Sequence, residues 1–230
     1  MLILALDTTT RAGSVAVLRR NQLLYEHSGD PNLTHGQRLP GDLMQACSAA
    51  GVSIEDVELF AVAAGPGSFT GLRIGIATMQ GLAMARGGRI VPVSTLEAIA
   101  AAAPEGPARI AAWMDAQRGE VFAQVFERVA GQARPLTAAI SAAPSVVLHQ
   151  HAEWLRDAVF EGDGATRYRD EIERSIGDSG RIAGSVPHLA AAIGRIAARF
   201  PERAVLPHAV VPMYVRRPDA EIARDRRAGA

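Results

Sequence analysis

The sequence predicts an α/β protein built from two related halves. Three observations lead to this fold class: apolar strand patterns alternate with helical patterns, a glycine-rich loop joins one strand to a long helix, and a strand–aspartate–turn–strand pattern occurs twice. Alternating strands and helices are typical of a sheet that is covered by helices. The duplicated pattern indicates two halves that face each other across a cleft.

The first half begins with three strands and continues with helices and strands in alternation. The uninterrupted apolar run at residues 2–6 is typical of a central strand that is covered on both faces. Gly51 and the pair Gly87 and Gly88 are expected to end two helices, and Pro40 predicts a kink or a later helix start. The predicted strands are residues 2–6, 14–18, 23–27, 58–64 and 89–94, and the predicted helices are residues 35–50, 70–86 and 95–103.

The second half starts after a linker at residues 104–107, which is rich in proline and glycine. An apolar run, an aspartate, a short turn that contains arginine and glycine, and a second strand then occur again. The two copies are residues 2–6, Asp7, 8–13 and 14–18, and residues 110–114, Asp115, 116–119 and 120–127. The repeat places an aspartate at the end of the first strand of each half.

We expect two domains. Residues 1–103 form the first, which is completed by a segment near residues 205–220, and residues 108–204 form a smaller second one. The second half is less regular in sequence. It contains a strand that runs into a glycine turn at residues 159–164 and a helix at residues 186–200 with a proline in its first turn.

The composition is that of an ordinary globular protein with no charge bias. The 24 basic residues, all arginine, balance 24 acidic residues. A formal net charge of zero argues against a nucleic-acid-binding surface on this chain alone. The single cysteine, Cys47, excludes an internal disulfide and is expected to be a buried packing thiol in a reducing cytoplasm. No targeting segment and no apolar run of membrane-spanning length is found.

The glycine-rich loop at residues 65–75 is the most informative segment. Its glycines permit positive φ and close backbone approach, and the helix start behind it exposes unpaired N–H groups. Two interpretations follow: an anion-binding loop that includes Gly65, Gly67 and Ser68, or a tight structural crossing from strand to helix. The loop lacks the lysine of a Walker motif and the glycine spacing of a dinucleotide fingerprint. Ser68 or Thr70 is expected to cap the helix.

Asp7 and the three threonines after it form a second candidate site. A carboxylate at the end of a strand, beside hydroxyls and turn N–H groups, can orient a metal-bound water near a phosphate. The alternative is an aspartate that caps its own hairpin turn. The candidates for a nucleotide or phosphate site in the two halves are Asp7, Thr8, Thr9, Thr10, Gly65, Gly67, Ser68, Asp115, Gly162 and Gly164.

The histidines give little support for a metal site. His35 lies at the start of the first predicted helix, but Leu39 follows four residues later where a second histidine would be needed. Two ligands on one helical face require that spacing. We therefore expect neither a metal nor another cofactor, and no catalytic set of serine, histidine and aspartate can be read from the spacing.

The helix pattern at residues 70–86 is apolar on nearly every face, which requires burial on more than one side. Gly71 and Gly75 form one stripe of small residues, and Ala77, Gly81 and Ala85 form another. One face can cover the sheet, and another is expected to meet a second helix closely. That second helix is either the internal one at residues 35–50 or one that belongs to another chain. The candidate partner-interface residues are Leu39, Leu43, Met44, Gly71, Arg73, Gly75, Ile76, Met79 and Leu82.

Four motifs occur in an order that resembles the bacterial TsaB (YeaZ) family of the tRNA threonylcarbamoyladenosine pathway. They are residues 3–10 (ILALDTTT), 65–75 (GPGSFTGLRIG), 93–98 (VSTLEA) and 115–121 (DAQRGEV). The resemblance is strong to about residue 125, and beyond it depends on residues 162–164 and 214–220. It implies an actin-like, Hsp70-like ATPase fold with two ribonuclease-H-like halves.

The resemblance also implies a non-catalytic paralogue of the transferase subunit TsaD. TsaD holds its metal with two histidines of one helix, and Leu39 stands where the second is expected. TsaB proteins dock TsaD through their first two long helices, which correspond to residues 35–50 and 70–86, and the same surface can pair two copies when TsaD is absent. The ATPase TsaE completes the assembly, tRNA is contacted only through the complex, and a nucleotide site in the cleft would be vestigial.

Two enzymatic functions stay open beside this interpretation. One is a nucleotide-dependent phosphotransferase or hydrolase that acts in the cleft between Asp7 and Asp115. The strand-end aspartates, the threonines and the glycine loops favour it, whereas the absence of lysine and of a histidine pair opposes it. The other is a metallopeptidase, which metal analysis would test.

Overall fold

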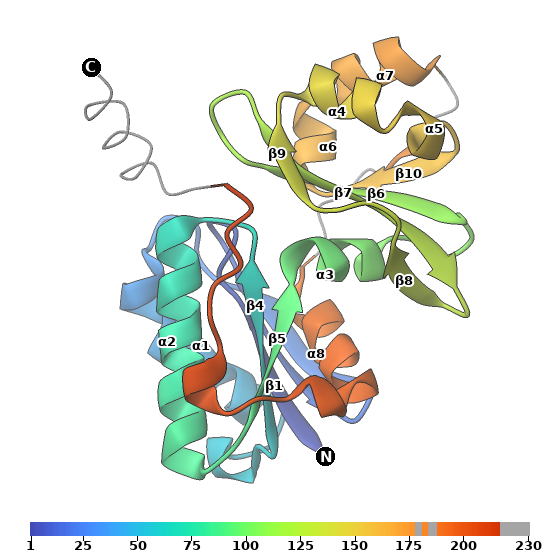
Figure 1. The fold of residues 1–230 in the computed structure, drawn as a ribbon. Helices are drawn as coiled ribbons and strands as arrows, with labels where there is room; N and C mark the ends of the chain where they lie inside the picture. The colour runs from blue at the N-terminus through green and yellow to red at the C-terminus, as the bar shows by residue number, and fades with distance from the viewer. Residues whose placement is uncertain (178–180, 184–187, 217–230) are drawn as a thin grey trace.

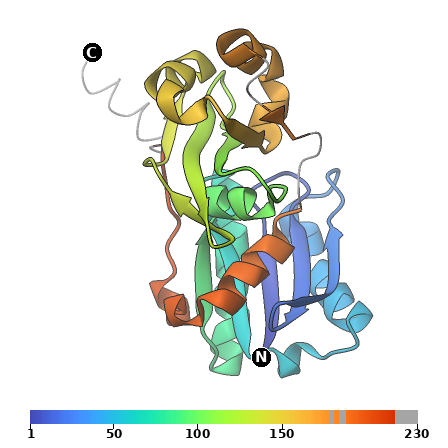
Figure 2. The ribbon, with the colours of Figure 1, turned by 90° about the vertical axis from the view of Figure 1, so that its right-hand side faces the viewer.

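Two mixed β-sheets, one in each half of the chain, form the framework of the protein (Figure 1). The computed structural model describes residues 1–177, 181–183 and 188–216. The sheets are stacked with helices on their outer faces and further helices between them, as the two views in Figures 1 and 2 show. The alternation of strands and helices that predicted an α/β protein is therefore confirmed.

The first sheet has the strand order β3-β2-β1-β4-β5. Its central strand β1 pairs antiparallel with β2 and parallel with β4. Alternate side chains of β1 enter two separate cores, one under the outer helices and one between the halves, which explains its uninterrupted apolar run. The elements are β1 (Leu2–Asp7), β2 (Ser14–Arg19), β3 (Gln22–Ser28), β4 (Leu59–Gly65), β5 (Ile90–Ser94), α1 (His35–Ala49), α2 (Phe69–Arg86) and α3 (Thr95–Ala102), with a 3₁₀ turn at Ile54–Asp56.

The two outer helices begin and end where local side chains satisfy their backbone. The Gln37 side chain accepts a hydrogen bond from the backbone N–H of Thr34 at 3.0 Å, which is half of a capping box. α1 therefore begins at His35 and continues through Pro40, so the later start expected from that proline is wrong. Ser68, not Thr70, caps α2, and Gly87 ends it in the left-handed conformation with φ of 62°.

The second sheet repeats the first. Read from β8, its order is β8-β7-β6-β10-β11, which matches β3-β2-β1-β4-β5 of the first sheet strand for strand; β9 is an addition that pairs with β7. The duplication predicted from the two strand–aspartate–turn–strand copies is confirmed by this shared topology. The elements are β6 (Arg109–Asp115), β7 (Val121–Val129), β8 (Gln132–Pro135), β9 (Ile140–Ala142), β10 (Ala158–Glu161), β11 (Arg181–Ile182), α4 (Pro144–Gln150), α5 (Ala152–Leu155), α6 (Asp163–Arg167) and α7 (Arg169–Ile176).

The last helix of each half packs between the two sheets. α3 contacts β6, β7 and β8 of the second sheet, and α8 (Ala190–Arg199) contacts β1 and β2 of the first. The first amides of α8 are satisfied by the first half, since Ala190 N donates to Ser14 Oγ at 3.0 Å and Ala191 N donates to Glu26 Oε1 at 2.8 Å. We propose that the chain divides near the expected residues 1–103 and 108–204, with α8 packed as part of the first body.

The last described segment, residues 200–216, returns to the first half. It contains 3₁₀ turns at Pro201–Arg203 and Pro207–Ala209. Cys47 is buried and unpaired, as expected for a packing thiol. The proline of the predicted 186–200 helix and the last four residues of the expected joining segment, 217–220, lie outside the described residues. Within the described residues no helix combines the length and apolar character needed to cross a membrane.

Candidate functional site

A cleft of about 960 Å³ lies between the two halves. Its walls are the β1–β2 turn and the start of α2 on one side, and the β6–β7 turn with Asp163 on the other; residues 213–216 line its rim. Of the ten predicted site residues, Thr9, Thr10, Gly67, Ser68 and Asp115 line this cleft, whereas Asp7, Thr8, Gly65, Gly162 and Gly164 lie outside its lining.

Asp7 caps its own turn. Its Oδ1 accepts hydrogen bonds from Thr9 N at 2.8 Å and from Thr9 Oγ1 at 2.6 Å, and only 2% of the residue is exposed. Burial raises the pKa of the Asp7 carboxyl above its usual value; the bonds from Thr9 oppose this, and the nearby charge of Asp163 adds to it. Through Oδ1 the carboxylate therefore stabilises its own hairpin turn.

The glycines of the 65–75 loop let the β1–β2 turn approach α2 closely. A Cβ at Gly71 would overlap the carbonyl oxygen of Thr8, and a Cβ at Gly75 would overlap the Thr8 hydroxyl. That hydroxyl donates to Gly71 O at 2.8 Å, and Ser68 N donates to Thr9 O at 3.1 Å. These contacts support the structural-crossing interpretation of the loop.

The β6–β7 turn repeats the arrangement at Asp7. Asp115 Oδ1 accepts from Gln117 N at 3.0 Å, which is the same two-residue spacing as Asp7 and Thr9, and Asp115 Oδ2 accepts from Arg167 Nη1 at 3.1 Å. Asp163 accepts from Asp115 N at 2.9 Å. Burial, with the charge of Asp115, raises the pKa of Asp163. Sequence reasoning missed Asp163, although it lies between the two predicted glycines.

Gly162 and Gly164 are needed for packing behind this wall. A Cβ at Gly162, whose φ is 109°, would overlap the carbonyl oxygen of Trp113, and a Cβ at Gly164 would lie 2.8 Å from the carbonyl carbon of Met114. Both glycines therefore let the chain after β10 cross the end of β6. This role matches that of Gly71 in the first half.

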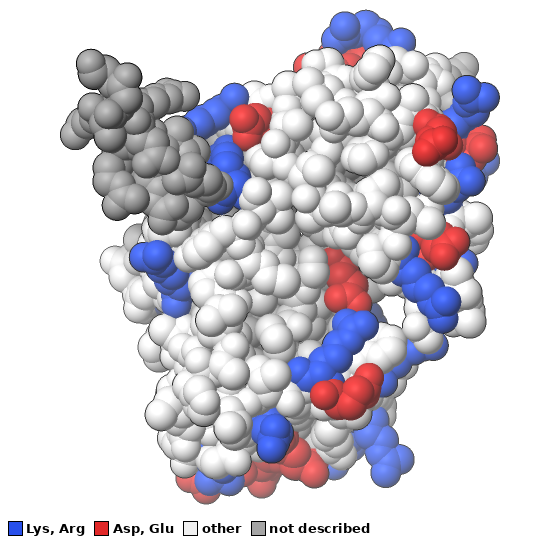
Figure 3. All heavy atoms as spheres, in the orientation of Figure 1, with Lys and Arg blue, Asp and Glu red and all other residues white. Residues whose placement is uncertain are grey.

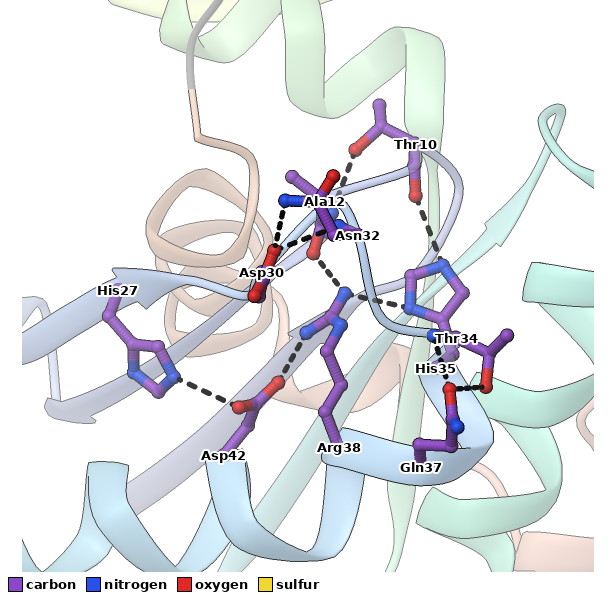
Figure 4. Close-up of polar contacts among 11 residues, drawn as sticks. Thr10, Ala12, His27, Asp30, Asn32, Thr34, His35, Gln37, Arg38 and Asp42 are labelled. Atoms are coloured by element: carbon purple, nitrogen blue, oxygen red, sulfur yellow. Dashed lines mark hydrogen bonds and ion pairs between the residues drawn. The ribbon is translucent and has the colours of Figure 1, made fainter.

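A buried arginine joins α1 to the β1–β2 turn (Figure 4). Arg38 is 7% exposed, and its guanidinium donates to Asp42 four residues later, to the carbonyl oxygen of Ala12, and to His35 Nδ1 at 2.8 Å. His27 Nε2 lies 3.7 Å from the other oxygen of Asp42. Sequence reasoning missed this cluster; the opposite charges at helical spacing were its only signal.

His35 uses both ring nitrogens within the chain. Its Nδ1 accepts from Arg38, so the proton is on Nε2, which donates to Thr10 O at 3.1 Å. Burial and the positive charge of Arg38 lower the pKa of His35. A metal could bind this imidazole only at the loss of one of these contacts. Among the described residues no cluster of three or more histidine, cysteine or acidic side chains could hold a metal ion.

Most of the predicted interface residues of α1 and α2 are buried in the chain's own core, so in this structure they leave little surface for a partner. Their side chains face the first sheet, or, for the two glycines, the Thr8 turn, because the sheet and the hairpin cover these faces of the helices. The buried set is Leu39, Leu43, Gly71, Gly75, Ile76 and Met79, and Leu82 is partly buried. Met44 and Arg73 are exposed, as is Met84, which the prediction did not include.

Glu161, at the end of β10, is a buried carboxyl whose effect on stability can be measured as a function of pH. It is 2% exposed, and burial raises its pKa from 4.5 to about 7. The folded state therefore binds more protons at Glu161 than the unfolded state between these values, so the contribution of Glu161 to stability falls as pH rises through this window. Glu161→Gln should reduce this pH-dependent decrease in the free energy of unfolding by about 1–2 kcal/mol.

Urea unfolding of wild type and variant at pH 5 and pH 8 measures this difference. Glu202→Gln, at an exposed glutamate, is the control and should leave the pH dependence unchanged. An equal loss of stability between the two pH values in wild type and Glu161→Gln would show that Glu161 does not carry the effect.

Comparison with known proteins agrees with the fold and the motifs. A family model described as "TsaD: tRNA N6-adenosine threonylcarbamoyltransferase" matches residues 32–205. The tRNA threonylcarbamoyladenosine biosynthesis protein TsaB of Escherichia coli (strain K12) is 38% identical over 130 residues, so the alignment spans only 56% of each chain. The TsaB protein of Bacillus subtilis (strain 168) is 28% identical over 228 residues, which are 96% of each chain.

A crystal structure of a Pseudomonas aeruginosa protein, described as similar to peptidase YeaZ, superimposes on this chain with a TM-score of 0.80. The two chains are 30% identical, and the match covers 94% of this chain and 99% of the other. The predicted actin-like, Hsp70-like fold class is thereby confirmed. With a family model that matches most of its length and a homologous structure that matches nearly all of it, this chain belongs to the TsaB (YeaZ) branch of the TsaD family.

Proposed function

We propose that this chain is a non-catalytic subunit of the machinery that makes threonylcarbamoyladenosine in tRNA. In this proposal it docks the transferase subunit TsaD through the outer faces of α1 and α2 and supports transfer of the threonylcarbamoyl group. The observation that carries the proposal is an exposed apolar surface on those two helices, in a chain whose relatives are named for this pathway.

The outer face of the two helices has the composition of an interface core. Met44 on α1 is 70% exposed and Met84 on α2 is 67% exposed. Small residues such as Gly41 and Gly81 lie exposed beside them and permit close approach of a partner's backbone. Interface cores are depleted in charge, and Arg73 is the only ionisable residue between Phe69 and Ala85 on α2. Figure 3 shows a broad uncharged region over α2.

The geometry of the cleft supports a non-catalytic role. Asp7 is bound by its own turn, and His35 is held between Arg38 and Thr10. One oxygen of Asp7 and both ring nitrogens of His35 are thus used within the chain. The alternative of a nucleotide-dependent phosphotransferase or hydrolase has Asp115 and Asp163 in the cleft in its favour, but both accept bonds from the chain itself. Calorimetric titration with Mg-ATP separates the two functions, since the alternative requires binding and turnover by the isolated chain.

Further partners follow from the family. We propose that TsaE joins the assembly, that tRNA is contacted only through the complex, and that the α1–α2 face pairs two copies of this chain when TsaD is absent. A soluble complex of this kind fits a cytoplasmic location.

Substitution of the exposed methionines tests the docking face. Met44→Arg and Met84→Arg place a charge where the partner would exclude water, so each should weaken binding to TsaD at least tenfold, or about 1.4 kcal/mol. Because both side chains are exposed, the variants should unfold at the wild-type urea concentration. Isothermal titration calorimetry with TsaD from the same organism measures the affinity.

Val146→Arg is the matched control. Val146 is also an exposed apolar residue (43%), but it lies on α4 of the second half, whereas the docking face belongs to the first half. Its affinity for TsaD should equal that of wild type. Unchanged affinity in both methionine variants would refute docking at this face. Ile76 and Met79 are unsuitable for the test because arginine there would enter the core.

A further inference from the structure

The C-terminal part of the described chain, residues 205–216, forms a strap that lies along α2 (Figure 1). It starts at a bridge between Val205 and Ile90, whose backbone groups exchange hydrogen bonds of 2.9 and 3.0 Å at the edge of the first sheet. The side chain of Gln80 on α2 then donates to Pro207 O at 2.8 Å and to Val210 O at 3.1 Å. Residues 205–210 of the strap are thus held by the first half.

Residues 213 and 214 of the strap contact the end of β4 and the outer surface of α2. Met213 N donates to Ala64 O at 2.6 Å, which fixes the backbone at the end of β4. The Tyr214 ring stacks on Phe69 with centroids 5.2 Å apart, and its hydroxyl accepts from Arg73 Nε at 3.1 Å. Phe69 and Arg73 are exposed residues of the first turns of α2. A protein docked on this helix would contact the tyrosine as well.

The end of the strap crosses to the second half. Arg216 Nη1 donates to Ala116 O at 2.9 Å and to Glu120 Oε2 at 3.2 Å, and the guanidinium lies 5.7 Å from the centre of the Phe122 ring. Ala116 and Glu120 enclose the β6–β7 turn, and Ala116 N donates to Glu120 O at 3.1 Å. One side chain therefore joins the first half to the turn that forms the opposite wall of the cleft.

We propose that the strap couples occupancy of the α2 face to the position of the β6–β7 turn, with Arg216 as the positioning residue. This inference rests on the proposed docking of TsaD and deepens it. A partner that covers Phe69, Arg73 and Tyr214 excludes water from their contacts and restrains the strap. Arg216 lies two residues after Tyr214, so the restraint reaches the cleft wall without a change in the core.

Hydrogen exchange of Arg216→Ala tests the coupling in the full chain, alone and with saturating TsaD. Alone, the variant should exchange the amides of residues 116–120 about two- to tenfold faster than wild type, because one charge-assisted contact of the turn is lost. TsaD should slow exchange in α1, α2 and residues 116–120 of wild type. In the variant it should slow exchange in α1 and α2 only.

Two controls make the result specific. Arg216→Lys should behave as wild type, because a single nitrogen makes both contacts and a lysine ammonium can replace it. Arg203→Ala removes another surface pair, with Glu97 at 2.8 Å, that does not reach the cleft turn, and it should leave residues 116–120 unchanged. Failure of the lysine variant to restore slow exchange would overturn the role of Arg216.

The remaining outcomes separate the coupling from the docking. If TsaD slows exchange in α1 and α2 but affects residues 116–120 equally in wild type and Arg216→Ala, or not at all, the coupling is wrong and the docking stands. If TsaD slows exchange in neither helix, the docking is wrong and the coupling falls with it.

Discussion

Replacement of Arg38 by methionine is expected to lower the free energy of unfolding by about 3–5 kcal/mol. Methionine fills a similar volume but leaves the Asp42 carboxylate, which is 15% exposed, without its cation. The carbonyl oxygen of Ala12 and His35 Nδ1 lose their donor at the same time. His27 Nε2 stays 3.7 Å from Asp42, but the permanent charge of the guanidinium is lost, and a buried carboxylate without it is costly because water cannot replace the cation. Urea unfolding followed by circular dichroism measures the loss.

The chain contains a matched control for this variant. Arg169 and Glu173 form an ion pair at the same four-residue helical spacing, but both side chains are exposed, 42% and 52%. Arg169→Met should therefore cost less than about 0.5 kcal/mol. Adding Asp42→Asn to Arg38→Met should recover part of the lost stability, since it removes the unpaired charge. A loss below 1 kcal/mol for Arg38→Met, roughly the value of a surface pair, would contradict the account.

Gly71→Ala is expected to destabilise the protein by about 2–3 kcal/mol, although alanine favours a helix more than glycine does. The added Cβ would overlap the carbonyl oxygen of Thr8, which is a backbone atom of the neighbouring turn and has no rotamer to change. The turn and the helix must therefore separate, which also breaks the bond from the Thr8 hydroxyl to Gly71 O. Thermal and urea unfolding measure the effect.

Gly81→Ala is the same substitution further along the same helix. Nothing lies within 4 Å of the added Cβ, so alanine should stabilise the helix by up to about 1 kcal/mol. The opposite signs of the two changes are the test. If both variants gain stability, the close contact between Thr8 and α2 does not exist in solution, and the structural role of the glycine loop is wrong.

Patterns formed by residues close together in the chain predict much of the fold. The apolar run of β1, the stop at Gly87 and the repeat around Asp7 and Asp115 depend on residues close in the chain, and each was found correctly. For Asp7 the sequence leaves two interpretations, a phosphate site and an aspartate that caps its own turn. Two hydrogen bonds from Thr9 now support the cap.

The largest difference between sequence and structure concerns which residues cover each face of α2. An apolar pattern on every side showed that the helix is covered more than once, but it did not show by what. The pattern places Gly71 and Gly75 at a partner interface, whereas in the structure both face Thr8, which is more than sixty residues earlier in the chain. Ile76 and Met79 face the sheet, so the exposed side is carried by Met84 and Arg73.

By itself, the sequence determined the α/β class, the duplication and the positions of the strand-end aspartates, because apolar periodicity and turn residues act over short distances along the chain. Only the tertiary structure decided which face of each helix is free, that Arg38 is buried against the β1–β2 turn, and that Arg216 reaches the opposite wall of the cleft. These contacts join residues far apart in the chain, and their energies depend on burial and distance, which no local pattern encodes.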